Sequence, residues 1–486
     1  MTNALRQQVY EARYERQSAA PGQRGGATAN ARLDQSVATA VLTQLQQTLK
    51  DRWAYYQAGN ADFDRFFELT LQQARKGQFS GARGLQQFQA VLSRLIGQGI
   101  DGHARIEVAG AQTDGPFLPF LIRPIGDRYV AFKPDRSGFL DADAPFITHL
   151  GANATEMISV DTLIEQLRPY SPQGSVQYCR HQALRLARRV GLWKNLLNIK
   201  IGNQLTVKLQ GQAPTSSDPP TRTLSLAQQF PLYGSFPRHG SQILENQIGY
   251  LRIAAMDEQA VADIQSWMPR FQNTRGLIID VRGNGGGRRT PLLAIASFLM
   301  QPQAPAIVVN AAKYRLHPDF GESHLQNRFL YPTDSPHWNH PERQAIAAFV
   351  QDFAPEWNPA VDQFSEWHYM VLSQRAGQDS YHYDRPVVVL VDDRCFSATD
   401  IFLAGMKQLP GVTLLGTPSG GGSARSVSRQ LGPVRVRLAS MASFQPDGKL
   451  FDGHGVKPNV IAHPSPAFFI GGEDRVLATA IRHISG

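Results

Sequence analysis

The sequence contains little cysteine, and it lacks the long features that mark several classes of protein. Two cysteines, Cys179 and Cys395, occur among 486 residues, which excludes a disulfide scaffold or a cysteine-rich zinc module. These two residues form at most one bridge. The formal net charge is +9, but no run of five or six Lys or Arg is present, so no nucleic-acid partner is indicated. No stretch reaches the ~18 apolar residues of a transmembrane span.

The first 32 residues lack an apolar periodicity and the apolar core of a signal peptide. They are rich in Arg, Gln, Ala and Gly, so we expect a mobile tail over 1–32. The chain as a whole is nevertheless globular in composition, because hydrophobic residues make up 42% of it. Its length is that of roughly three domains.

The rest of the chain changes character along its length. Apolar residues recur at helical spacing over 33–102, which predicts an N-terminal helical domain, and mixed α and β patterns follow over 103–211. Residues 212–245 are interpreted as a linker, because the segment begins with a stretch rich in Pro, Ser and Thr. Over 246–486, short apolar strands alternate with helices, which predicts an α/β core with a mostly parallel sheet. An insertion rich in aromatic residues, Pro and His interrupts this core at 312–384.

Individual elements can be expected from these patterns. Asp257 is suited to cap a helix that follows it. A further helix is expected at 184–197, in the mixed region. In the core we expect strands at 249–253, 276–281, 306–309, 387–391 and 412–415, and helices at 291–300 and 398–408.

Two places in the core carry residues suited to chemistry. Ser397 follows an apolar strand and a polar turn and stands where the next helix begins, beside free backbone N–H groups that can stabilise an oxyanion. The same position also suits a simple helix cap. The glycine-rich segment 282–287 follows strand 276–281, and its amide groups are able to approach a ligand closely. Its spacing fits neither a Walker loop nor a dinucleotide site.

Ser397 and the glycine-rich segment occur along the chain together with other recognisable segments. Residues 249–253 read GYLRI, 277–287 read LIIDVRGNGGG and 101–103 read DGH; 451–458 add FDGHGVKP. The set resembles the tail-specific, or C-terminal-processing, family of serine peptidases. The resemblance implies a crotonase/ClpP-like α/β core with Ser397 as nucleophile, and protein or peptide substrates. It implies no cofactor and no metal, and an exported or periplasmic location.

The residue that would act as catalytic base differs from that of many family members. The position of their catalytic lysine is Gly422 here, and 416–425 contain no Lys. A second branch, to which the tricorn core and chlamydial secreted proteases belong, uses Ser, His and an acid, and His103 and Asp452 stand at the matching positions. Many relatives have Glu at the acid position, so the shorter Asp452 requires a slightly different placement of His103. In this interpretation imidazole takes the serine proton and the carboxylate orients it.

Some assignments stay open in the sequence. His454 is a rival base, whereas Cys395 is interpreted as packing. The oxyanion donors are expected to be the N–H of Ala398 and that of Gly285 or Gly286.

Within 103–211, segment 144–151 resembles a degenerate PDZ-like strand, which would bind a peptide by strand addition. The predicted function is a serine endopeptidase with a Ser-His-acid triad. The alternatives are a non-catalytic ligand-binding protein on the same fold and a crotonase-like acyl-CoA enzyme.

Overall fold

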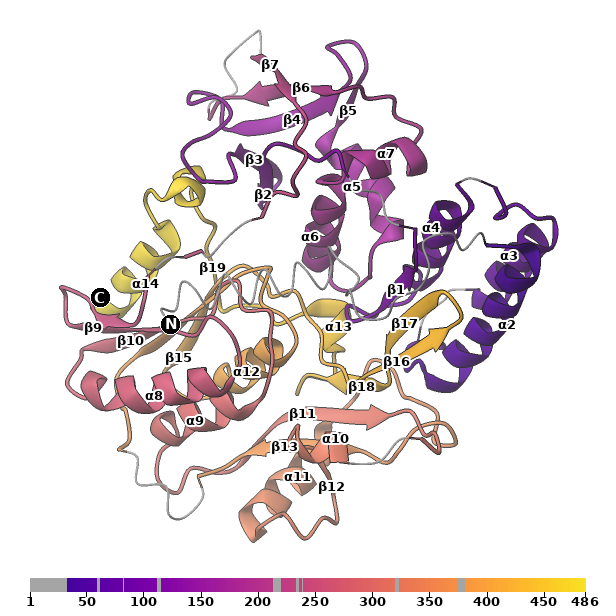
Figure 1. Ribbon diagram of the computed structural model, residues 1–486. Helices are drawn as coiled ribbons and strands as arrows, with labels where there is room; N and C mark the ends of the chain where they lie inside the picture. Colours follow the sequence, from indigo (N-terminus) through magenta and orange to yellow (C-terminus); the bar gives the residue numbers. More distant parts are fainter. Residues whose placement is uncertain are drawn as a thin grey trace.

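The computed structural model shows a mixed α/β protein built around several sheets (Figure 1). The predicted tail 1–32 lies outside the described residues, as do parts of the predicted linker and insertion. The structure describes residues 33–58, 62–81, 83–111, 115–212, 220–232, 236–237, 239–319, 323–374 and 381–486.

A six-stranded sheet forms the centre of the core, in the order β19-β15-β14-β10-β9-β8. Its strand pairs are parallel except for β8 with β9. Parallel sheets are covered on both faces, which explains the continuous apolar runs in the sequence. The strands are β8 (Gln242–Ile243), β9 (Ile248–Arg252), β10 (Gly276–Asp280), β14 (Val387–Val391), β15 (Val412–Gly416) and β19 (Val460–Ile461).

Helices cover both faces of this sheet (Figure 1). Leu277 and Ile279 belong to the apolar cluster that contains residues of α8 (Glu258–Phe271), α9 (Thr290–Leu299) and α12 (Ala398–Met406). Ile278, between them, joins a cluster with α14 (Arg475–Ser485) on the other face. The expected cap is present, since the Asp257 side chain accepts from the Ala260 amide at the start of α8.

The N-terminal helices pack against strands from the far end of the chain. β1 (Arg105–Val108) pairs with β17 (Val434–Ala439), which pairs with β16 (Ser426–Leu431). Apolar residues of β1 and β17 share one cluster with the N-terminal helices. Residues shortly after the first helical block therefore lie beside residues from the C-terminal part. The helices are α2 (Gln35–Arg52), α3 (Phe63–Arg75) and α4 (Gly84–Ile96).

A second six-stranded sheet, with helices, forms the upper part of the molecule in Figure 1. The single helix expected at 184–197 is wrong, because two helices, α6 and α7, cover this range with a break at Arg188 and Arg189. The Arg188 carbonyl accepts from the Leu118 amide, and Arg189 bridges to Phe117, so the backbone leaves the helix there. The elements are β2 (Leu121–Ile125), β3 (Arg128–Phe132), β4 (Phe146–Gly151), β5 (Met157–Ser159), α5 (Val160–Leu167), η1 (Arg168–Tyr170), α6 (Val176–Ala187), α7 (Val190–Leu196), β6 (Gln204–Gln210) and β7 (Thr221–Ser225).

A four-stranded sheet, β12-β13-β11-β18, lies at the bottom of Figure 1, and its strands β12 and β13 belong to the predicted insertion. The strand expected at 306–309 extends much further, to Tyr314, because β11 pairs with both β13 and β18. The elements are β11 (Ile307–Tyr314), α10 (Ser323–Gln326), β12 (Tyr331–Pro332), α11 (His340–Asp352), β13 (His368–Leu372) and β18 (Met441–Phe444), followed by α13 (Phe451–His454) and η2 (Pro466–Ile470).

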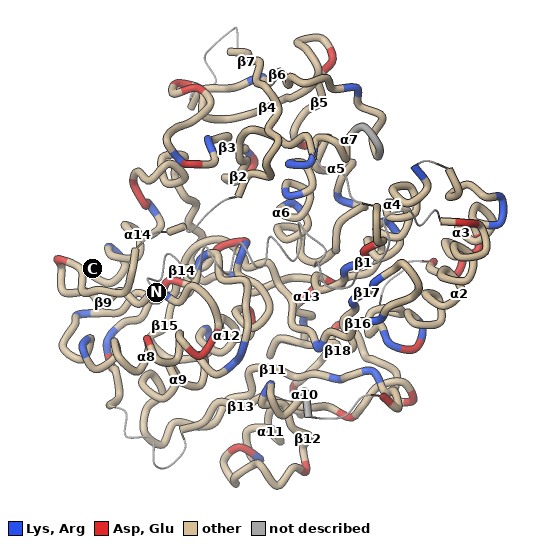
Figure 2. The backbone as a smooth tube through the Cα atoms, in the orientation of Figure 1, with Lys and Arg blue, Asp and Glu red and all other residues tan. Residues whose placement is uncertain are grey.

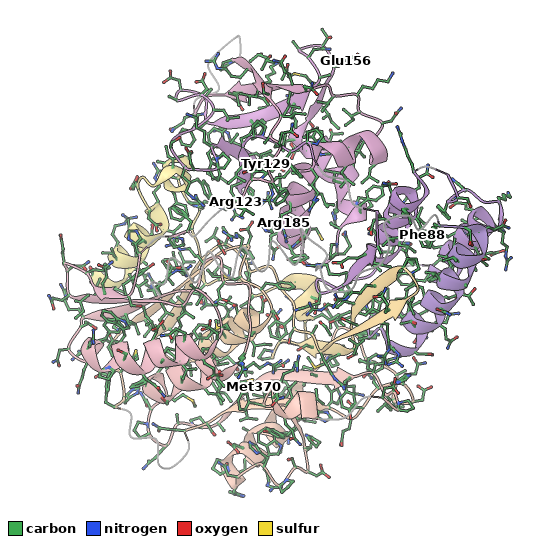
Figure 3. All side chains as sticks on the ribbon, viewed as in Figure 1. Phe88, Arg123, Tyr129, Glu156, Arg185 and Met370 are labelled. Carbon is green, nitrogen blue, oxygen red and sulfur yellow. The ribbon has the colours of Figure 1, made fainter. Side chains whose placement is uncertain are left out.

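Basic and acidic residues are interspersed along the chain (Figure 2). One buried ion pair joins the upper part to the core: Arg123 of β2 donates to Asp393 Oδ1 at 2.6 Å. Figure 3 shows Arg123 and Arg185 where the upper part faces the core. Because Asp393 belongs to the turn before Ser397, the upper part holds one side of that turn.

The structure confirms the mixed α/β fold class. The PDZ-like assignment and the proposed domain boundaries stay predictions. Cys179 and Cys395 are both free and buried.

Candidate functional site

Ser397 stands at a sharp turn between β14 and α12. Its backbone has φ +62° and ψ −120°, a conformation that residues with a side chain rarely adopt. Such geometry costs on the order of 1–3 kcal/mol and persists only where the surroundings enforce it. The serine makes no side-chain capping bond to α12 within the described chain, so the simple cap does not account for it.

The hydroxyl of Ser397 faces an imidazole. His103 Nε2 lies 3.1 Å from Ser397 Oγ, which is hydrogen-bond distance. The His103 ring packs on Phe396, with the ring centroids 4.6 Å apart. Its backbone N–H donates to Asp101 Oδ1 at 2.8 Å.

Asp101, in the DGH segment, is itself firmly held. It is buried, and its Oδ2 accepts from Trp53 Nε1 and from the Ala439 amide, both at 2.8 Å. Burial and the nearby charge of Asp452 raise the pKa of Asp101. This segment therefore fixes the position of His103 from its backbone.

A buried carboxylate lies behind the imidazole. Asp452 Oδ1 is 3.9 Å from His103 Nδ1, an ion-pair distance longer than a hydrogen bond. Its Oδ2 accepts from Tyr55 Oη at 2.9 Å and from the Ser423 amide at 3.2 Å, and its Oδ1 accepts from the Gly102 amide at 3.3 Å. Burial, then the charges of Asp452 and Asp101, raise the pKa of Tyr55 well above its usual range, so the phenol stays a donor. These three donors hold the Asp452 carboxylate in place behind the imidazole.

Gly422 occupies the position of the family lysine, and the structure gives a reason for glycine there. It has φ +141°, and a Cβ would lie 2.7 Å from Phe396 Cε2 and 3.1 Å from His103 Cε1. A side chain at 422 would therefore collide with the aromatic ring that supports the imidazole. The space that a lysine needs is occupied by His103 and Phe396.

The expected oxyanion donors differ in their surroundings. Ala398 and Gly285 line the same cavity as Ser397. The Gly286 N–H, in contrast, donates to Asn284 Oδ1 at 2.9 Å. A Cβ at Gly286 would lie 2.7 Å from Ser397 Cβ, so glycine is required there for close approach. Ala398 and Gly285 are thus better placed to meet a substrate oxygen than Gly286.

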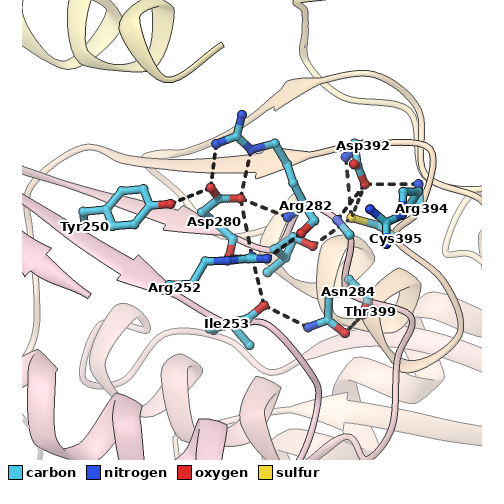
Figure 4. A network of polar contacts seen from close by, with 12 residues as sticks. Tyr250, Arg252, Ile253, Asp280, Arg282, Asn284, Asp392, Arg394, Cys395 and Thr399 are labelled. Carbon is cyan, nitrogen blue, oxygen red and sulfur yellow. Dashed lines mark hydrogen bonds and ion pairs between the residues drawn. The ribbon is translucent and has the colours of Figure 1, made fainter. Parts of the chain in front are cut away.

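A buried polar network supports the glycine-rich segment and the turn before the serine (Figure 4). Asn284 Nδ2 donates to the Ile253 carbonyl, while Asn284 Oδ1 accepts from the Thr399 hydroxyl at 2.8 Å. The Phe396 amide donates to the Asn284 carbonyl at 3.0 Å. Asn284 therefore ties the glycine-rich segment to both sides of Ser397.

The same network contains compensated charges (Figure 4). Arg282 donates to both oxygens of Asp280, at 3.0 and 2.6 Å, and to Asp474. Burial raises the pKa of Asp280, but Arg282 and Arg252 outweigh it and lower that pKa to about 2. Tyr250 Oη also donates to Asp280, at 2.6 Å. The end of β10 is thereby fixed next to the glycine-rich segment.

Two sequence alternatives are placed away from this chemistry. His454 is 45% exposed and pairs with Glu356 at 2.8 Å. The Cys395 thiol donates to the Val281 carbonyl at 3.1 Å, and burial raises its pKa well above the usual range. A buried neutral thiol is inert packing.

Asp101, His103 and Asp452 are also close enough to be compared with a metal site, since their donor atoms lie within 4.8 Å of one another. Both carboxylates, however, accept N–H or O–H hydrogen bonds from the protein. That donor set suits hydrogen bonding to an imidazole better than a cation.

Sequence reasoning missed Tyr55, Ser423 and Thr399, which hold the acid and the glycine-rich segment. Tyr55 and Asp452 are far apart in the chain, and no local pattern links them. Asn284 lies inside the glycine-rich segment, and this position alone could have indicated its supporting role.

Comparisons with known proteins found a family match and similar folds. Residues 247–462 match the model of Peptidase family S41. No curated protein matches the sequence. Among solved structures, mature CPAF is similar at 17% identity with a TM-score of 0.62, over 90% of this chain and 95% of that chain. Mature CPAF complexed with lactacystin gives 16% identity and a TM-score of 0.61, over 93% and 97%.

At these identities the solved structures show a shared fold. Among the described residues no helix has both the length and the apolar character needed to cross a bilayer. The matched region, residues 247–462, contains Ser397, the glycine-rich segment and Asp452. Within residues 247–462 the chain is therefore similar to peptidase family S41, the tail-specific or C-terminal-processing serine peptidases.

Proposed function

We propose that the chain hydrolyses internal peptide bonds of proteins or peptides with Ser397, His103 and Asp452 as a catalytic triad. The observation that carries this proposal is the 3.1 Å contact between His103 Nε2 and Ser397 Oγ. Neutral imidazole accepts the serine proton while the oxygen attacks the substrate carbonyl carbon. The imidazolium then donates that proton to the leaving amine, and water hydrolyses the acyl-enzyme by the same steps.

The remaining residues have supporting roles in this proposal. Asp452 stabilises the imidazolium across 3.9 Å, a distance that fits the shorter side chain at a position where relatives carry Glu. The N–H groups of Ala398 and Gly285 bind the oxyanion. Asn284 positions the glycine-rich segment, because its side chain contacts both Gly286 and Thr399.

A fluorophosphonate probe tests the nucleophile. The parent is expected to be labelled, and Ser397→Ala to lose both labelling and peptide hydrolysis without a change in fold. Ser428→Ala, on the exposed side of β16, is the matched control and is expected to be labelled as the parent is. Labelling that persists in Ser397→Ala would overturn the assignment, and an unlabelled, inactive parent would favour the non-catalytic binding protein.

A pair of histidine variants tests the base. His103→Ala is expected to lose about 10³-fold or more in turnover, because triad members act as a unit. His454→Ala is the control and is expected to keep the parent rate, since His454 pairs with Glu356. An active His103→Ala beside an inactive His454→Ala would exchange the two roles. Asp452→Asn is expected to cost as much as His103→Ala or less, through the wrong imidazole tautomer.

A further inference from the structure

The cavity that contains Ser397 is rich in arginine. It has a volume of about 470 Å³, and His103, Ser397, Ala398 and Gly285 all line it. Of the described residues that line it, none is Asp or Glu. Five are arginines, from four parts of the chain: Arg105, Arg288, Arg289, Arg328 and Arg437. One of them, Arg288, is exposed and pairs with Glu258 at 2.9 Å.

Two of these arginines face each other across a strand pair. Arg105 of β1 is directly opposite Arg437 of β17, and like charges in that arrangement are destabilising. Two residues along the same strands, Glu107 is opposite Arg435, which is the compensated arrangement. The two arginines of this strand pair that line the cavity are therefore like-charged neighbours.

Two more arginines meet in the interior of the cavity wall. Arg289 is buried, and it donates to the Arg328 carbonyl at 3.0 Å and to Ser423 Oγ at 3.1 Å, both neutral acceptors. Burial and the charge of Arg328 lower the pKa of Arg289 to about 9. Ser423 also donates its amide to Asp452, so this positive wall is adjacent to the triad.

We propose that this cavity binds a carboxylate of the substrate, that of an Asp or Glu side chain next to the scissile bond. The inference rests on the proposed peptidase function and specifies its substrate class. An anion lowers the electrostatic cost of like-charged arginines held close together. The planar guanidinium binds a carboxylate through two parallel hydrogen bonds, which gives geometric specificity as well as affinity. A basic side chain at the same position faces a wall of arginines and is disfavoured.

Quenched fluorescent peptides of one cleavable sequence test the proposal. Each peptide carries Glu, Gln or Lys at one position flanking the scissile bond, with an amidated C-terminus. At one or more positions the parent is expected to show a kcat/KM for Glu at least tenfold above that for Gln, with Lys lowest. Equal rates for Glu, Gln and Lys at every position would overturn the proposal.

A second peptide series, with free C-termini, separates the two sources of a carboxylate. If the gain appears only with a free terminal carboxylate, and Glu has no effect in amidated peptides, the assignment to an acidic side chain is wrong. If Glu has its effect in both series, the side chain is the ligand.

Variants connect the preference to the arginines. Arg289→Gln and Arg437→Gln are expected to reduce the Glu-to-Gln ratio to nearly one, whereas Arg289→Lys keeps part of it. Arg437 is exposed, so its variant tests the proposal even where Arg289→Gln fails to fold. Arg482→Gln, exposed on α14, is the matched control and keeps the parent ratio. A ratio that stays unchanged in both Arg437→Gln and a folded Arg289→Gln would overturn the role of the arginines.

Failure of the peptidase function gives a different result from failure of this inference. Fluorophosphonate labelling of the parent reports on Ser397 independently of peptide sequence. Fluorescence anisotropy with fluorescein-labelled Glu and Lys peptides, on the Ser397→Ala protein, reports binding without turnover. Preferential binding of the Glu peptide to an unlabelled, inactive parent would reject the peptidase function and keep the carboxylate site. Labelling of the parent with equal binding of both peptides would keep the peptidase function and reject the carboxylate site.

Discussion

Two buried arginines near the glycine-rich segment, Arg282 and Arg289, differ in what surrounds their charge. Under the strand ends, Arg282 contacts Asp280 and Asp474, which outweigh the effect of burial and raise its pKa well above the usual range. In the cavity wall, Arg289 donates to neutral acceptors, and its pKa is lowered to about 9 by burial and by Arg328. The first arrangement is complete within the protein. In the second, the acceptors of the guanidinium carry no negative charge.

The difference separates structural charge from functional charge. A buried pair supports the fold mainly because removing one partner leaves the other uncompensated. A buried cation with neutral hydrogen-bond acceptors is costly to the fold, and in our proposal its place in the cavity serves substrate binding. Stability measurements and substrate measurements should therefore respond to different arginines.

The largest effect is expected when the compensated group is broken. Asp280→Asn keeps the shape of the side chain but leaves Arg252 and Arg282 with less negative charge. The free energy of unfolding should fall by about 3–5 kcal/mol, as for other broken buried pairs. Urea denaturation measures this loss. A change below about 1 kcal/mol, the size of an ordinary surface substitution, would contradict the structural role.

The contribution of Asp280 should also depend on pH in one direction. Because its pKa is lowered from an ordinary value of 3.8 to about 2, the stabilisation is present above pH 3.8 and is lost as pH falls to about 2. The difference in unfolding free energy between the parent and Asp280→Asn should therefore be constant from pH 7 to about 5 and narrow below 4. Denaturation at a series of pH values measures it, and a gap that widens on acidification would reverse the assigned sign.

A smaller effect on stability is expected from the cavity arginine. Arg289→Met replaces a buried cation with an apolar side chain of similar length. It removes the cost of burying the charge but also removes two hydrogen bonds to neutral acceptors, and the two effects offset each other. We expect the free energy of unfolding to change by less than about 1 kcal/mol. The same urea measurement compares it with Asp280→Asn. If the two substitutions are equally destabilising, the two arginines do not differ as described.

The smallest effect is expected from salt. Surface and cavity charges open to solvent are screened within roughly 10 Å at 0.1 M salt, whereas buried pairs are screened much less. Raising NaCl from about 0.05 to about 0.5 M should lower kcat/KM for a Glu peptide several-fold and leave that for the Gln peptide nearly unchanged. Equal salt dependence for both peptides would show that the arginines do not bind the substrate carboxylate.

Much of the fold could be predicted from the sequence because its signals are local. The apolar runs at 276–281 and 387–391 are buried on both faces of the central sheet, and the Asp257 cap starts α8. Pairings between distant segments were beyond local patterns. The register that opposes Arg105 to Arg437 depends on β1 meeting a strand from the other end of the chain.

For the candidate site too, local motifs could be predicted from the sequence, whereas contacts between distant segments could not. Ser397, His103 and Asp452 were identified from ordered motifs, and the structure brings the three together. Gly285 and Gly286 could not be separated in the sequence, because the choice depends on the side chain of Asn284, which engages the Gly286 amide. The support of Asp452 by Tyr55 is likewise a tertiary contact.

The left-handed backbone at Ser397 has a consequence for how this chain would change if hydrolysis were no longer needed. Glycine adopts a φ of +62° without the steric cost that serine bears there. If catalysis were lost, a side chain at 397 would no longer be needed, and substitution of Ser397 by glycine would make the protein more stable. A glycine in place of this serine would mark descendants that keep the arginine-lined cavity for binding alone, and it would do so in the sequence, before any assay.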